Sequence, residues 1–264
     1  MLLIFFYGKE YIDLTHNSKK GLYREIFVLS DLPIYQKQKI LNRFFSIHQQ
    51  IFTNVDYQTY RKQILETRAE NITLHMFKNK QGKDVGFCIL YRYRMLMDKN
   101  SIIVFRSDAG LLTKYRHKLS TLSFGLLYVL RYKLLHPFEN MIYCESFVHP
   151  SSYHLLYKYY PLVYPSPDKN MPKNISVLLK TLRQYFQFKP ALSGSNLCAY
   201  SGWVTIDSDP DLMEKKKLQY PDVAYFHEKN PKFKEGDGLI VLIPVKIIYI
   251  VKSLFTLTIA RLSK

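Results

Sequence analysis

The chain has 264 residues, of which 47% are hydrophobic and 15% aromatic, and this composition excludes an intrinsically disordered protein. Lysine and arginine exceed aspartate and glutamate by 38 − 21 = 17, so we expect attraction to polyanions: nucleic acid, an anionic membrane or a phosphorylated ligand. The three cysteines are odd in number and far apart, which argues against a disulfide framework or a zinc site and favours a reducing, cytoplasmic location.

The first predicted elements are a strand and two helices. Residues 22–29 have a strand-like composition, and Ser30 to Pro33 is a typical helix start with proline near the first turn. An apolar stripe at helical spacing follows, and a shorter helix is expected over 57–68. The stripe consists of Ile34, Ile40, Leu41, Phe44, Phe45, Ile47, His48 and Ile51. The apolar opening, 1–7, is interpreted as a strand or buried terminus, because it lacks a basic leader and a cleavage site.

The spacing of apolar residues then changes from the helical repeat to the alternation of a strand. Residues 71–78 and 85–96 are predicted strands joined by the polar, glycine-containing loop 79–84. One face of the second strand carries Val85, Phe87, Ile89, Tyr91, Tyr93 and Met95. Because Arg92 and Arg94 alternate with two of these tyrosines, the segment fits either a surface that stacks on nucleic acid or a half-buried strand. The second interpretation explains the same residues more simply.

A further strand, a helix, a strand and a last helix follow. Residues 101–106 are a predicted strand that leads into a basic turn at 114–120. Leucines at helical spacing then predict a helix that stops at His136 and Pro137. A strand is expected over 141–148, before a tyrosine-rich helix that begins after Pro150 and ends at Pro161.

Four prolines in the segment 161–172 are typical of a boundary. We therefore expect a core over 1–165 and a C-terminal extension over 166–264 that packs on it. The last segment, 245–264, combines apolar residues with four cations but is not a spanning helix, because no run reaches about 18 uncharged apolar residues. Two interpretations stay open: an amphipathic helix on an anionic membrane, or a segment docked on the core.

The order strand, two helices, three antiparallel strands, helix, strand, helix resembles the GNAT superfamily of N-acetyltransferases. The stretch 148–160 reads Val-His-Pro-Ser-Ser-Tyr-His-Leu-Leu-Tyr-Lys-Tyr-Tyr and is similar to the family's helix after the fifth strand, N-x-x-A-x-x-L-Y-x-x-x-G-F. This resemblance implies an α/β (α+β) fold with a mixed, mostly antiparallel sheet flanked by helices, in which the fourth and fifth strands splay apart. It implies an acyltransferase that moves an acyl group from acetyl-CoA, another acyl-CoA or an acyl carrier to the amine of an unidentified acceptor, without a metal.

The resemblance places the pyrophosphate of coenzyme A at the basic turn, which the family writes Q/R-x-x-G-x-G/A. Here the leading arginine is present, whereas leucine and threonine occupy the two small positions. Backbone N–H groups at a helix start bind an anion, and nearby cations and hydroxyls add donors. The expected cofactor contacts are Arg106, Lys114, Arg116, His117, Lys118, Leu119, Ser120 and Thr121. A solvated basic turn that caps a core helix is the alternative.

Acyl transfer to an amine needs a base for the nucleophile and an acid for the departing thiolate. By position Tyr157 resembles the family's acid, with Tyr153 as the fallback. Glu145, in an otherwise apolar strand, is expected to act as base or to orient the amine, with Asp108 also near the acceptor. His149 is a second candidate base, and capping of the turn is its alternative role.

Hydrolase and metalloenzyme motifs are missing from the sequence. The other class of function left open is a noncatalytic protein on a GNAT-like scaffold that binds nucleic acid or an anionic membrane, because a fold does not determine an activity. The missing glycines of the basic turn favour this alternative, whereas Arg116 and Tyr157 favour the enzyme.

Overall fold

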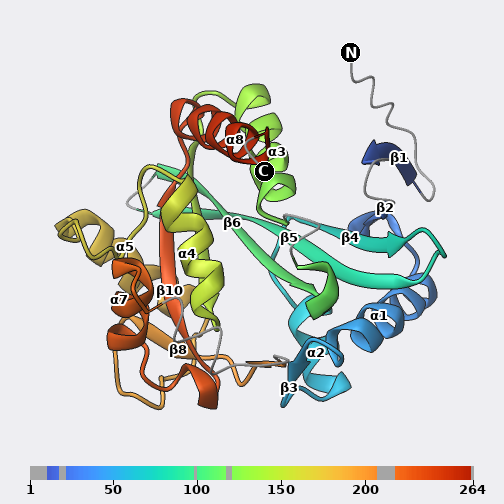
Figure 1. Cartoon of the computed structure of the whole chain (residues 1–264), viewed down its shortest axis with the longest axis horizontal. Coiled ribbons are helices and arrows are strands. Elements are labelled where there is room, and N and C mark those ends of the chain that lie inside the picture. The colour runs from blue at the N-terminus through green and yellow to red at the C-terminus, as the bar shows by residue number, and fades with distance from the viewer. Residues whose placement is uncertain (1–10, 18–21, 98–99, 117–120, 207–217, 263–264) are drawn as a thin grey trace.

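One eight-stranded sheet organises the chain in a computed structural model that describes residues 11–17, 22–97, 100–116, 121–206 and 218–262 (Figure 1). In spatial order its strands are β1 (Tyr11–Asn17), β2 (Leu22–Val28), β4 (Asn71–Asn79), β5 (Asp84–Met97), β6 (Asn100–Leu111), β7 (Asn140–Phe147), β10 (Asp237–Pro244) and β8 (Cys198–Tyr200). Neighbouring strands are antiparallel except β6 and β7, which are parallel. The predicted mixed, mostly antiparallel sheet is confirmed.

Helices cover both faces of this sheet (Figure 1). The first face is covered by α1 (Ile34–His48), α2 (Tyr57–Leu65) and α5 (Lys173–Tyr185). The second is covered by α3 (Thr121–Leu135), α4 (Pro150–Tyr159), α7 (Pro221–Lys229) and α8 (Ile247–Leu262). Short elements complete the described chain: η1 (Leu29–Asp31), η2 (Thr113–Tyr115), η3 (Phe233–Glu235) and the two-stranded pair of β3 (Phe52–Thr53) with β9 (Val204–Thr205). The order of elements up to α4 is the one expected of a GNAT-like core.

The alternation predicted for β5 is present with one exception. Phe87, Ile89, Tyr91, Tyr93 and Met95 pack on the first face against α1. Val85 packs on the second face, because the register of β4 with β5 shifts between Phe77 and Lys78. Tyr91 and Tyr93 are 5% and 4% exposed, so they are not available to stack on a nucleic acid strand.

The part of the chain after residue 165 contributes strands to the same sheet. β10 pairs with β7 from Leu239 opposite Phe147 to Pro244 opposite Ile142, and β8 pairs with the other edge of β10. Because an inserted strand shares its hydrogen bonds and core with its neighbours, the C-terminal part is built into the sheet that carries the candidate site. A domain boundary at 165 stays a prediction.

Candidate active site

The parallel strands β6 and β7 separate half-way along their length. They pair only from Ile102 opposite Asn140 to Phe105 opposite Tyr143, although β6 continues to Leu111 and β7 to Phe147. β6 is the fourth and β7 the fifth strand of the expected core. The splay that the resemblance implies is therefore present, and the edge of β6 beyond Phe105 is not covered by the backbone of β7.

Glu145 of β7 lies across this divergence. Its carboxylate accepts hydrogen bonds from Arg106 Nη2 at 2.8 Å and from the Ser107 N–H at 2.9 Å. The Ser146 N–H donates to it as well, at 2.8 Å, and the Glu145 side chain is only 8% exposed. Three donors, one of them the Arg106 cation, hold the Glu145 carboxylate in place between β6 and β7, and its role as a base stays a prediction.

The Arg106 guanidinium lies between this carboxylate and two aromatic rings. It is 4.8 Å from the ring centroid of Phe186 and 5.0 Å from that of Phe188, both of which follow α5. Such rings stabilise a partly desolvated guanidinium through cation–π attraction. The C-terminal part of the chain therefore supplies one wall of the corner that fixes Arg106.

Asp108 lies two residues further along β6. Its carboxylate accepts a hydrogen bond from the Tyr91 hydroxyl at 2.7 Å. Burial and the nearby charge of Glu145 raise the pKa of Asp108 to about 7, in spite of the opposing effects of Arg106 and Tyr91. A carboxyl group with a pKa near the working pH exchanges protons efficiently, so Asp108 is the group at the divergence best suited to act as a base.

Buried aromatic residues surround Asp108 on the first face of the sheet. Burial and the Asp108 charge raise the pKa of Tyr60, a residue of α2 that is 1% exposed. The His48 ring lies 4.8 Å from that of Tyr60 and 4.6 Å from that of Trp203. Burial lowers the pKa of His48 to about 4, so its ring is neutral at pH 7. From the sequence, His48 is expected only to be one residue of the apolar stripe of α1.

Among the described residues, several polar atoms of this aromatic cluster have no hydrogen-bond partner: the Tyr60 hydroxyl, both His48 ring nitrogens and Trp203 Nε1. Unpartnered buried polar atoms are uncommon in folded proteins, and a group of them marks a place worth testing for function. The sequence contains no signal for this cluster, because it joins α1, α2 and the segment before β9.

The basic turn lies at the far end of β6. Arg116 donates from Nε to the Leu111 carbonyl at 3.2 Å and from Nη2 to the Ile206 carbonyl at 3.0 Å. The Lys114 ammonium lies 5.3 Å from the ring centroid of Tyr115. Thr121 is the first residue of α3, whereas His117, Lys118, Leu119 and Ser120 lie outside the described residues. Pyrophosphate binding by this turn stays a prediction.

At the start of α4, His149 caps the helix. Its Nδ1 accepts a hydrogen bond from the Ser151 N–H at 3.1 Å, as in the capping alternative. Tyr153, the fallback acid, is fully buried and donates from its hydroxyl to the Pro165 carbonyl at 2.8 Å. Both side chains therefore have structural contacts of their own.

Tyr157 lies further along α4, in a hollow of about 420 Å³ that is also lined by Asp168 and by Lys252 of α8. Burial and the charges of Asp168 and Asp222 raise the pKa of Tyr157, so its hydroxyl keeps its proton at neutral pH. Within the described ranges, no hydrogen bond joins Tyr157 to Asp108 or Glu145. The structure thus brings Arg106, Asp108 and Glu145 together, whereas Tyr157 lies on α4 and His149 caps the start of that helix.

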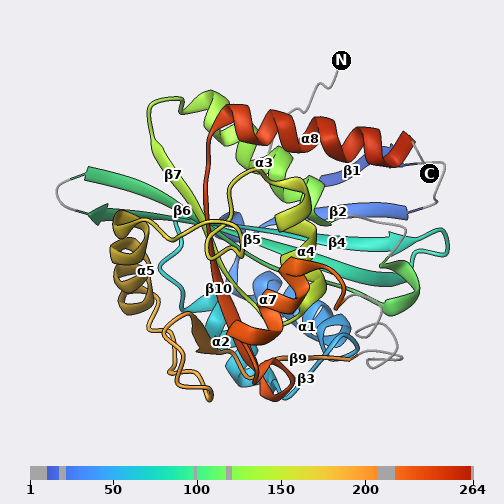
Figure 2. The same ribbon diagram turned by 60° about the vertical axis from the view of Figure 1, so that its left-hand side comes forward.

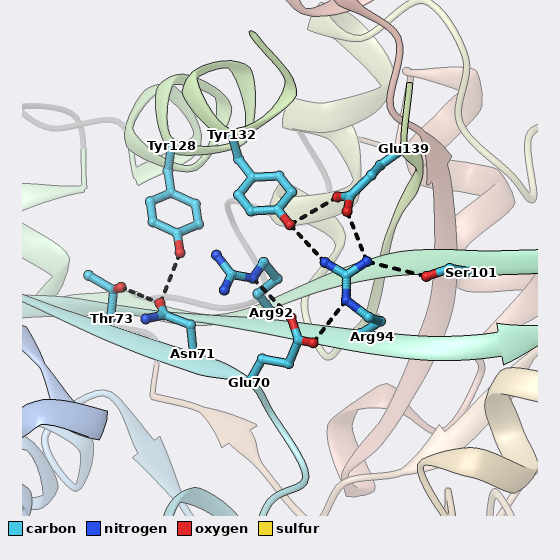
Figure 3. Close-up of polar contacts among 9 residues, drawn as sticks. All are labelled: Glu70, Asn71, Thr73, Arg92, Arg94, Ser101, Tyr128, Tyr132 and Glu139. Carbon is cyan, nitrogen blue, oxygen red and sulfur yellow. Dashed lines mark hydrogen bonds and ion pairs between the residues drawn. The ribbon is translucent and has the colours of Figure 1, made fainter. Parts of the chain in front are cut away.

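A second polar cluster lies under α3, on the opposite face of β5 (Figure 3). Arg94 donates to Glu70 at 2.9 Å and to Glu139 at 2.8 Å, and Tyr132 of α3 donates to Glu139 at 2.9 Å. The Arg92 guanidinium lies 4.6 Å from the centroid of the Tyr132 ring. Since both arginines are paired with carboxylates or a ring, this cluster fastens α3 to the sheet.

Metal-ligating side chains are not gathered anywhere in the described ranges: no group of three or more His, Cys, Asp or Glu is arranged to hold a metal ion there. Cys88, Cys144 and Cys198 are buried and free, without a disulfide.

No family model and no curated protein matches the chain. Among similar solved structures, an aminoglycoside acetyltransferase from an uncultured soil metagenomic sample, in complex with sisomicin, is 13% identical, covers 63% of this chain and 88% of its own, and has a TM-score of 0.29. A mutant spermidine N-acetyltransferase SpeG from Vibrio cholerae is 11% identical over 52% of this chain and 77% of its own, with a TM-score of 0.29. A mutant AtaT toxin bound to the C-terminus of the antitoxin AtaR is 14% identical, covers 60% of this chain and 98% of its own, and has a TM-score of 0.32. At these values the likeness says nothing about the reaction of this chain.

Proposed function

We propose that the chain is an N-acyltransferase that moves the acyl group of acetyl-CoA or another acyl-CoA to an amine. The observation that carries this proposal is the divergence of β6 and β7, with Arg106, Asp108 and Glu145 beside it. The open edge of a strand fits an extended ligand, which the fixed charges beside it would orient. A base with a pKa near neutrality fits a reaction that needs a proton acceptor.

The open edge of β6 suits the amide-containing arm of a coenzyme A thioester. An extended chain with amide groups can pair with an uncovered strand edge, as peptides do in strand addition. The N–H of Ser107 points to this edge and is occupied by Glu145. Backbone groups alternate in direction along a strand, so those of Ala109 are expected to point the same way and to be the first available for the ligand.

The pyrophosphate is proposed to lie near the start of α3, with Thr121, Lys114 and Arg116. The positive end of the helix dipole and the side-chain cations favour an anion there. The Arg116 guanidinium is held beside this turn by its hydrogen bonds to the Leu111 and Ile206 carbonyls. The contributions of His117, Lys118, Leu119 and Ser120 are part of the same proposal.

Asp108 is proposed to remove a proton from the acceptor ammonium. The neutral amine then attacks the thioester carbonyl carbon, the C–N bond forms and the C–S bond breaks. The thiolate that leaves takes up a proton from a tyrosine hydroxyl, and the second proton lost by the attacking nitrogen restores that hydroxyl, while the proton on Asp108 passes to solvent. Two tyrosines are candidate donors. Tyr157 is proposed from the resemblance to the family. Tyr143 is proposed from its position, because its hydroxyl lies 2.8 Å from Ser107 Oγ at the divergence. Burial raises the pKa of Tyr143 well above its usual value, so it too keeps its proton until needed.

The test is release of the free thiol of coenzyme A from acetyl-CoA in the presence of diamines, polyamines, amino sugars and peptides. Asp108→Asn is expected to lower kcat by about 100-fold or more, with acetyl-CoA affinity unchanged in calorimetry. The matched control is Asp31→Asn, the same chemical change at an exposed position of η1, which should leave kcat unchanged. In the wild type, kcat/KM should rise with pH through about 7.

Tyr143→Phe and Tyr157→Phe separate the two donors, because each removes one hydroxyl and nothing else. The variant that loses kcat while keeping acetyl-CoA affinity identifies the acid. If acetyl-CoA does not bind and no acceptor yields thiol, the chain is not an acyltransferase of this kind.

A further inference from the structure

α8 has two faces of opposite exposure. Ile250, Ser253 and Leu257 are buried, with 0%, 0% and 6% of their surface exposed, where the helix docks on α3 and α4. On the other side, four exposed apolar residues recur at helical spacing: Ile248 (67%), Val251 (49%), Phe255 (66%) and Ile259 (50%). We call these four residues the α8 stripe. Figure 2 shows α8 as an outer helix lying along α3.

The end of α3 extends this apolar surface. β7 and β10 are antiparallel, with Ile142 opposite Pro244, so the end of α3 and the start of α8 meet at one end of the sheet. Near this place Leu134, Leu135 and Phe138 are 58%, 68% and 98% exposed. Exposed apolar side chains gathered in one region of a surface mark an interaction site.

The charges around the stripe are mostly positive. Neither α3 nor α8 contains an aspartate or glutamate. Lys246 and Lys252 are exposed at the start and in the middle of α8. In the hollow between α4 and α8, three lysines, Lys158, Lys169 and Lys252, surround a single carboxylate, that of Asp168. A ligand on this face therefore meets an excess of positive charge.

We propose that the α8 stripe binds the surface of an anionic lipid membrane, with α8 lying in the plane of the interface and the lysines contacting lipid phosphates. An apolar stripe beside cations is the pattern of interfacial helices. A second copy of the chain fits less well, because it would bring the same lysines against each other. None of the helices in the described ranges is long and apolar enough to cross a membrane. This inference goes beyond acyl transfer and holds whether or not that reaction takes place.

The test is sedimentation of the full chain with vesicles of phosphatidylcholine alone or with 30% phosphatidylserine, at low and high salt. The wild type is expected to sediment with the anionic vesicles at least about tenfold better than with the neutral ones, and less at high salt. Ile248→Ser with Phe255→Ser should reduce binding about tenfold or more without changing the melting temperature, since both side chains are exposed.

The matched control is Val177→Ser with Leu192→Ser, which removes two apolar side chains, 50% and 54% exposed, from elsewhere on the molecule. It should bind vesicles like the wild type. Three results would overturn the proposal: no binding of the wild type to anionic vesicles, equal loss in the control, or a concentration-dependent dimer that disappears in the Ile248→Ser, Phe255→Ser variant. The last result would mean that the α8 stripe binds a second copy of the chain instead of a membrane.

Discussion

Arg106 and Glu145 form an ion pair of 2.8 Å across the point where β6 and β7 separate. The Arg106 side chain is 20% exposed and that of Glu145 8%, so each would be left largely desolvated without the other. The pair joins β6 to β7 by a side-chain contact beyond the point where their backbone pairing ends.

Glu145→Gln is expected to lower the free energy of unfolding by about 2 to 4 kcal/mol, because it leaves Arg106 partly buried without an opposite charge. Urea unfolding measures this change. Glu228→Gln is the control, since it removes a carboxylate that is 67% exposed from its pair with Lys229 and should cost less than about 1 kcal/mol. Similar losses of unfolding free energy in the two variants would mean that the Arg106–Glu145 pair stabilises the protein no more than an exposed pair does.

Asp108 should make the protein less stable as pH rises from about 4 to about 7. The carboxyl group has a pKa of about 4 in an unfolded chain and about 7 in the fold, so the folded state holds an extra proton between these values. The difference in unfolding free energy between the wild type and Asp108→Asn should therefore change by about 2 to 4 kcal/mol across this window, with the wild type favoured at the acid end. A difference that does not vary with pH would show that Asp108 titrates normally.

The contribution of His48 to stability should have the opposite dependence on pH. Its pKa is lowered to about 4 in the fold, against about 6.5 in an unfolded chain, so the unfolded state takes up a proton first as pH falls. Its contribution is complete above about pH 6.5 and is lost between 6.5 and 4, by about 3 kcal/mol. His48→Phe keeps an aromatic ring among Phe52, Tyr60 and Trp203 and removes the titration. Its unfolding free energy should fall less than that of the wild type on acidification, as measured by urea unfolding at pH 7 and 5.

The Arg94 cluster of Figure 3 should contribute modestly to stability. Because the Arg94 side chain is 39% exposed, Arg94→Ala is expected to cost about 1 kcal/mol, and its coupling with Glu139→Gln in a double-mutant cycle should be about 0.5 to 1 kcal/mol. Lys62→Ala, at a 3.9 Å pair with 72% and 61% exposed side chains, should cost almost nothing. A coupling near zero would limit the role of this cluster in holding α3.

Local patterns in the sequence were sufficient for the order of elements. The apolar stripe of α1, the alternation of Tyr91 and Tyr93 with the arginines, and the helix start at Pro150 each depend on residues within a few positions of one another. Helix and strand periodicity are properties of such near neighbours, and the basic composition needs no structure at all.

Tertiary structure decided everything that joins distant residues. The partner of Glu145 lies 39 positions earlier, and that of Asp108 lies 17 positions earlier on a neighbouring strand. Only the sheet register places β10 beside β7, and only the folding of the segment between α4 and α5 places Asp168 beside Tyr157. A pKa depends on the desolvation and charges that such contacts create, so the sequence indicated carboxylates near a divergence, whereas the fold determined that Glu145 is paired and Asp108 is able to accept a proton.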